Sequence, residues 1–236
     1  LACTHLLKDD LGKSEKNVTF KEMFSKTREI NYLSAARIFL FASRDVWFVV
    51  GIPLYFYAEL SDGSEAGNYK AFFLIGTFMS FWIILYGVVQ TMVPKLLQAD
   101  SCSEQELVGA TRNWGLILFL VLVTLAVSSF FLQENPFWLT QILVGGLAIF
   151  GVVFAVNSSL HSYLILAFTQ SERVTMDVGF YYMANAAGRL LGTLLSGWTY
   201  QIVGIVGCLT TATLMVGVSV LATIRLKSGY EPQAAS

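Results

Sequence analysis

The sequence predicts an all-α membrane protein with six transmembrane helices. Of its 236 residues, 55% are hydrophobic and 13% are charged, with a mean hydropathy of +0.62. The charged share is about half that of an ordinary soluble domain. Apolar runs also recur along the chain, each long enough to cross a bilayer, which takes about 20 residues.

The six predicted spans follow one another with short connections. They cover residues 34–58, 70–93, 113–132, 138–168, 177–201 and 203–226. The fourth run is longer than one crossing requires, so we expect that helix to tilt. Because only the turn IVG at 202–204 divides the last two spans, we expect them to form a helical hairpin.

Polar segments flank the spans at both ends of the chain. We therefore divide it into a cytoplasmic linker (1–33), a six-helix transmembrane domain (34–226) and a cytoplasmic tail (227–236). The first residue is leucine and no signal-peptide pattern follows, so we expect the chain to begin within a longer protein.

Orientation follows from the lysines and arginines, which favour the cytoplasmic side of short loops. With six spans, twelve of the fifteen fall on the side shared by the two termini, whereas only Lys70 falls on the opposite side. This asymmetry predicts a multi-pass protein of the cell membrane with both termini in the cytoplasm.

The two remaining basic residues, Arg44 and Arg189, lie inside predicted spans. At 1.5 Å per residue they sit about 15 and 18 Å along the first and fifth spans, near mid-membrane. A charge there costs about 2.5 to 3.5 kcal/mol, so it normally faces protein or water. We interpret both arginines as substrate-binding residues, with structural pairing as the alternative.

Asp45 directly follows Arg44 in the sequence FLFASRDVWFVVG. Neighbouring side chains on a helix point about 100° apart, so we expect Arg44 and Asp45 each to find a partner on another helix. Asp45 is then a charge partner for an arginine or a group that couples transport to protons. The sequence favours neither.

Two stripes run along the fifth span. Small residues recur at four-residue steps: Ala184, Gly188, Gly192 and Ser196. Such a seam permits close helix packing. The neighbouring stripe carries Tyr181, Asn185 and Arg189. We predict that this second stripe lines a cavity and that Tyr181 and Asn185 contribute to substrate binding.

Three further polar residues are candidates for lining a cavity: Arg37, Asn157 and His161. Arg37 lies one heptad before Arg44 and so on a similar face. Its alternative is to extend toward the lipid headgroups. The alternative for His161 is a packing role.

Two arginines at mid-depth suit an anionic ligand, because the planar guanidinium group matches carboxylate, phosphate or arsenate oxygens. The three scattered cysteines and the lack of a nucleotide-binding loop predict no metal and no cofactor. The net charge of −1 gives no reason to expect nucleic acid. Asp45 is the only acid well inside a span, which argues against an intramembrane enzyme.

The charged first and fifth spans and the uncharged third and sixth spans resemble the C-terminal half of a twelve-helix major facilitator superfamily transporter. In that superfamily the third and sixth helices of each half are peripheral. The stretches REINYLSAARIFLFASRDVWFVVGIPLY (28–55) and VGFYYMANAAGRLLGTLLSGWTYQ (178–201) resemble, more specifically, the ArsJ family of organoarsenical efflux transporters.

This resemblance implies an N-terminal half that this sequence lacks and a function in arsenate resistance. The implied substrate is 1-arseno-3-phosphoglycerate, an organoarsenical anion formed when glyceraldehyde-3-phosphate dehydrogenase uses arsenate in place of phosphate. That dehydrogenase is the implied functional partner. Two alternatives stay open: a facilitator for another phosphorylated or carboxylated metabolite, and a membrane bundle that transports nothing.

Overall fold

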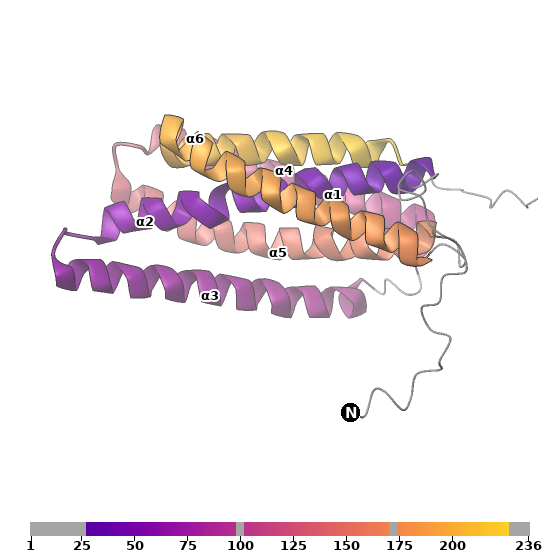
Figure 1. The fold of residues 1–236 in the computed structure, drawn as a ribbon, viewed down its shortest axis with the longest axis horizontal. Coiled ribbons are helices and arrows are strands. Elements are labelled where there is room, and N and C mark those ends of the chain that lie inside the picture. Colours follow the sequence, from indigo (N-terminus) through magenta and orange to yellow (C-terminus); the bar gives the residue numbers. More distant parts are fainter. Residues whose placement is uncertain (1–26, 98–101, 170–173, 227–236) are drawn as a thin grey trace, which may run out of the picture.

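A computed structural model describes residues 27–97, 102–169 and 174–226, and the regular structure in these residues is helical throughout (Figure 1). The helices are α1 (Arg28–Val46), a π-helix (Trp47–Gly51), α2 (Ile52–Leu60), α3 (Glu65–Leu96), α4 (Glu104–Phe131), α5 (Pro136–Phe168) and α6 (Val174–Ile224). The first predicted span begins earlier than expected, because α1 starts at Arg28 and takes in the end of the predicted linker. Residues 1–26 of that linker and the predicted tail 227–236 lie outside the described residues.

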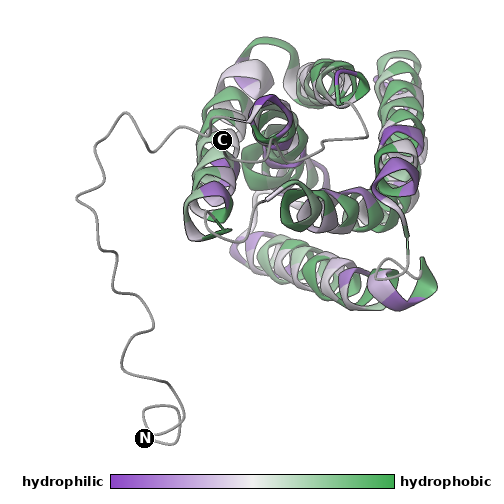
Figure 2. Cartoon of the chain, turned by 90° about the vertical axis from the view of Figure 1, so that its right-hand side faces the viewer, coloured by the Kyte–Doolittle hydropathy of each residue, from purple (hydrophilic) through white to green (hydrophobic). Residues whose placement is uncertain are grey.

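Five helical segments are long and apolar enough to cross a membrane, counting α1 through α2 as one. The protein is therefore an all-helical bundle of the kind that membranes accommodate. In Figure 2, which looks along the helices, hydrophobic residues, in green, predominate along the helices of the bundle.

The last helix, α6, folds back on itself at Gly204, whose φ of 70° and ψ of −152° are not helical. Both of its halves reach the same part of α1: Gly188 approaches the Ile38 carbonyl, and the Ser219 hydroxyl donates to the Ala36 carbonyl at 2.8 Å. In a straight helix these two residues of α6 would be about 46 Å apart. The predicted hairpin is confirmed, and we call residues 174–203 the N-arm and 205–224 the C-arm.

The connections alternate between the two ends of the bundle. Residues 61–64, residues 132–135 and the Gly204 turn lie at one end, while α1, α4 and α6 begin at the other (Figure 1). The described basic residues outside the bundle interior follow this division. Arg28, Lys95, Arg112 and Arg225 lie toward the end where α1 begins, and Lys70 lies toward the opposite end.

The order of the helices from the inside to the outside of the bundle differs from the expectation that the third and sixth spans are outermost. The α3 helix, which is the second span, is the least covered: only Ala71, Ile75, Trp82 and Val93 are buried in it. The C-arm packs against α1 and α4 over much of its length. Absence of charge shows which helices tolerate lipid, but it does not determine which ones face it.

A π-helical turn separates α1 from α2. Pro53 has no amide hydrogen and its ring crowds the preceding turn, and the widened turn Trp47–Gly51 lies immediately before it. The Ser196 hydroxyl on the N-arm accepts from the amides of Val50 (3.1 Å) and Gly51 (3.3 Å). These bonds anchor the π-helix to α6 just beyond the charged residues of α1.

Candidate functional site

Asp45 lies between two arginines that come from different helices. Arg44 Nε donates to Asp45 Oδ1 at 2.6 Å, and Arg189 Nε donates to Asp45 Oδ2 at 3.2 Å. The Asp45 side chain is only 2% exposed, that of Arg44 is 13% exposed and that of Arg189 is 61% exposed. We call these three residues the Asp45 cluster; it carries two positive charges against one negative charge.

The expectation that Arg44 and Asp45 would each find a partner on another helix is right for Asp45 and wrong for Arg44. Arg44 pairs with Asp45, its neighbour in the chain. Its side chain is long enough to bend across the angle of about 100° between neighbouring side chains on a helix. Asp45 points toward α6, where Arg189 meets it.

The small-residue seam makes this meeting possible. Ala184, Gly188, Gly192 and Ser196 are all buried, as predicted for a packing seam. A Cβ atom on Gly188 would clash with the Ile38 carbonyl oxygen, and one on Gly192 would lie 2.6 Å from the Ala42 carbonyl oxygen. The absence of side chains here lets the N-arm touch the α1 backbone. Arg189 is thereby brought within reach of Asp45.

Arg37 occupies a separate position, one heptad earlier on α1. It is 4% exposed, so it points into the bundle instead of extending toward the headgroups. Its Nη1 donates to the carbonyl and hydroxyl oxygens of Ser158 on α5, at 3.0 and 3.2 Å. Its guanidinium carbon lies 4.8 Å from the centre of the Tyr181 ring. We call Ser34, Arg37, Ser158, His161 and Tyr181 the Arg37 cluster.

Several polar atoms of this cluster have no hydrogen-bond partner among the described residues. These atoms are Ser34 Oγ, Arg37 Nε, Tyr181 Oη and both ring nitrogens of His161. Asn185 Oδ1, on the N-arm, also lacks a partner among the described residues. Ser34 lies one turn before Arg37 on α1 and His161 one turn after Ser158 on α5, so each faces the same way as its neighbour. Burying such groups unpaired is unfavourable.

Phe41 connects the two clusters. The guanidinium carbon of Arg37 lies 4.0 Å from the centre of the Phe41 ring, and that of Arg44 lies 5.1 Å from it. Both cations thus lie against one aromatic ring that is itself 5% exposed. Cation–π contact of this kind partly offsets the loss of hydration without neutralising either charge.

The structure divides the predicted site residues between these places. Arg44, Asp45 and Arg189 come together, whereas Tyr181 and His161 lie with Arg37. Asn185, half-buried one turn before Arg189 and one turn after Tyr181, lies between the two groups on the N-arm. Asn157 lies elsewhere: its amide donates to the Thr111 carbonyl at 3.0 Å, across the contact between α4 and α5.

Sequence reasoning missed two contributors, Phe41 and Ser34. Ser158 lies between Asn157 and His161 in the chain, the two residues of α5 that the sequence did mark as candidates. Phe41 and Ser34 gave no signal, because a phenylalanine and a serine in an apolar helix are ordinary.

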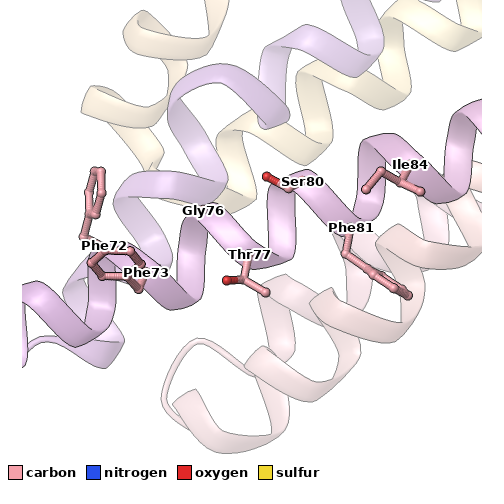
Figure 3. Close-up of a pocket in the computed structure, with 7 residues that line it drawn as sticks. All are labelled: Phe72, Phe73, Gly76, Thr77, Ser80, Phe81 and Ile84. Atoms are coloured by element: carbon pink, nitrogen blue, oxygen red, sulfur yellow. The ribbon is translucent and has the colours of Figure 1, made fainter.

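A hollow on the surface of α3 is a less suitable site. It is lined by Phe72, Phe73, Gly76, Thr77, Ser80, Phe81 and Ile84, all from this one helix (Figure 3). It has no charged residue in its lining, and its three phenylalanines are more than half exposed. Such a surface suits lipid chains better than an anion.

Among the described residues, no group of three histidine, cysteine, aspartate or glutamate side chains could hold a metal ion. Comparison of the chain with protein-family models, with curated proteins and with solved structures finds no match.

Proposed function

We propose that this chain is the C-terminal six-helix half of a major facilitator superfamily transporter that exports an organic anion. The proposed substrate is 1-arseno-3-phosphoglycerate, and the proposed outcome is arsenate resistance. The observation that carries the proposal is the Asp45 cluster, in which one buried carboxylate is shared by two guanidinium groups. A second anion is needed to balance the charge.

The two arms of α6 support six membrane crossings. The N-arm and C-arm, of roughly 30 and 20 residues, would extend about 45 and 30 Å, and a hydrocarbon core is about 30 Å thick. With each arm as one crossing, the helices cross six times and both termini share a side. The excess of basic residues at that end favours the cytoplasm.

The exposed Arg189 gives the anion a point of entry. Its side chain is 61% exposed in this half alone, on the surface that the proposed N-terminal half would face across a central cavity. An arriving oxyanion can take over one guanidinium group from Asp45, because the two carboxylate oxygens are held by different arginines. The bond from Arg44 then keeps Asp45 in place.

An arsenate or phosphate group suits this exchange better than a neutral sugar or an amine. Guanidinium groups bind tetrahedral oxyanions through two parallel hydrogen bonds. The Arg44 and Arg189 side chains each donate to Asp45 through Nε. Their terminal nitrogens remain to hold a ligand.

The test is arsenate resistance in cells that carry the full-length parent gene together with its glyceraldehyde-3-phosphate dehydrogenase. The variants are Arg44→Gln and Arg189→Gln, and the matched control is Arg112→Gln, an exposed arginine in the first third of α4. Membrane abundance is followed by blotting. We expect the first two variants to lose resistance and retain arsenic while the control does neither. Full resistance in both variants would refute the proposal.

A further inference from the structure

We infer that the Arg37 cluster is a second anion subsite and that the protein selects ligands with two anionic groups over ligands with one. This inference rests on the proposed function and names the class of substrate more closely. It is carried by the charge, burial and hydrogen bonding of the Arg37 cluster, which are independent of the Asp45 cluster.

The first step is the charge of Arg37. Asp45 is already shared by two other arginines, and no carboxylate among the described residues pairs with Arg37. Among the described residues, the hydrogen bonds of Arg37 go to the neutral oxygens of Ser158. A guanidinium group that is 4% exposed, with no carboxylate partner in the described part of the chain, is a strong attractor for an anion, since the low-dielectric surroundings screen it weakly.

The unpartnered groups around Arg37 are hydrogen-bond donors for the most part. The Arg37 Nε atom, the Ser34 hydroxyl and the Tyr181 hydroxyl each carry a hydrogen that they can donate. A neutral His161 ring carries one more such hydrogen. All four residues are more than nine-tenths buried. A gathering of donors around a cation matches an anion better than it matches a metal ion or an amine.

The third step is the spacing of the two subsites. Arg37 and Arg44 are one heptad apart, which is about 10 Å along the helix axis. Their guanidinium carbons are at most 9.1 Å apart, because they lie 4.0 and 5.1 Å from the centre of the same Phe41 ring. Two anionic groups joined by a three-carbon linker are of the size to reach both cations.

A groove lies beside Ser34, at the edge of the Arg37 cluster. Its volume is about 280 Å³, and its lining includes Ser34 and Ile38 on α1 and Ala184 on the N-arm. It runs along the contact between the two helices that carry the arginines. Ser34 is the member of the Arg37 cluster that belongs to this lining, so the groove reaches the edge of the cluster.

The test is binding to the full-length protein in lipid nanodiscs, with propane-1,3-diol bisphosphate and propyl phosphate as probes, followed by calorimetry. We expect the wild type to bind the bisphosphate at least about tenfold more tightly, the effect of one added charge-assisted hydrogen-bonded group. In Arg37→Gln this preference should disappear while the affinity for propyl phosphate stays within about twofold. In Arg44→Gln both affinities should fall.

A second variant guards against misfolding of Arg37→Gln. Tyr181→Phe removes only the unpartnered hydroxyl and keeps the ring against Arg37; it should reduce the preference by about threefold or more. Equal affinity of the wild type for the two probes, or an unchanged preference in Tyr181→Phe and Arg37→Gln, overturns the inference and leaves the proposed function standing. If the wild type binds neither probe, both proposals fall.

Discussion

At the scale of single residues, Asp45 decides how the interior is held together. Its two oxygens bind arginines from two helices that are far apart in the chain, and its side chain is almost completely buried. Arg189, by contrast, is largely exposed, so water can replace much of what it loses. We therefore expect substitutions of the three residues of the Asp45 cluster to lower the free energy of unfolding by very different amounts.

We expect Asp45→Asn to lower the free energy of unfolding by about 3 to 5 kcal/mol, the usual effect of removing one partner from a buried ion pair. The change leaves two guanidinium groups near each other without a counter-charge. Arg189→Gln is the matched comparison, and we expect it to cost under about 1 kcal/mol because its side chain is mostly exposed. Unfolding of the purified protein in detergent measures both. Equal losses would contradict this account.

At the scale of elements, features that rest on a regular sequence spacing could be predicted from the sequence. Features that depend on residues far apart in the chain could not. The seam on the N-arm could be predicted, because four-residue steps of Gly and Ala have one common explanation in a membrane helix. The turn at Gly204 could be predicted from the lack of any other residues to connect two spans.

The π-helix could not be predicted in the same way. Pro53 signals an interruption, but the widened turn is held by the Ser196 hydroxyl, 145 residues from Gly51 in the chain. Nor could the sequence show that Tyr181 lies with Arg37 and not with Arg189. Regular spacing puts Tyr181 and Arg189 on one stripe, yet one end of that stripe is buried against α1 and the other is exposed.

We expect Gly192→Ala to separate the N-arm from α1 and to cost about 1 to 3 kcal/mol, as overpacking does. The added methyl group would lie 2.6 Å from the Ala42 carbonyl oxygen and 2.9 Å from Asp45 Cβ. Gly197→Ala is the control, because a Cβ atom there meets nothing within 4 Å. Thermal unfolding in detergent measures the difference. The account fails if the two alanine variants are equally stable.

At the scale of the whole molecule, the bundle has two chemically different ends. The connections 61–64 and 132–135 lie at the end with few basic residues, and α4 begins at the opposite end (Figure 1). If α6 crosses the membrane twice, as proposed, these two ends lie on opposite sides of the bilayer.

Labelling of single cysteines in intact cells tests this arrangement. In a variant whose native cysteines are replaced by serine, we expect Glu65→Cys and Gln133→Cys to react with a membrane-impermeant maleimide. Gln105→Cys, near the start of α4, should react only after the cells are made permeable. All three positions are exposed in the bundle, so a lack of reaction reflects the membrane and not packing. Labelling of all three in intact cells would contradict the proposed topology.

The separation of 144 positions between Asp45 and Arg189 in the chain also has a consequence for the order of synthesis. A ribosome adds about 5 to 20 residues per second, so roughly 7 to 30 s pass between the synthesis of the aspartate and that of its distant partner. Throughout that interval α1 must enter the bilayer without α6. Arg44, the immediate neighbour, can pair with Asp45 before α6 is made, because both residues belong to the same helix.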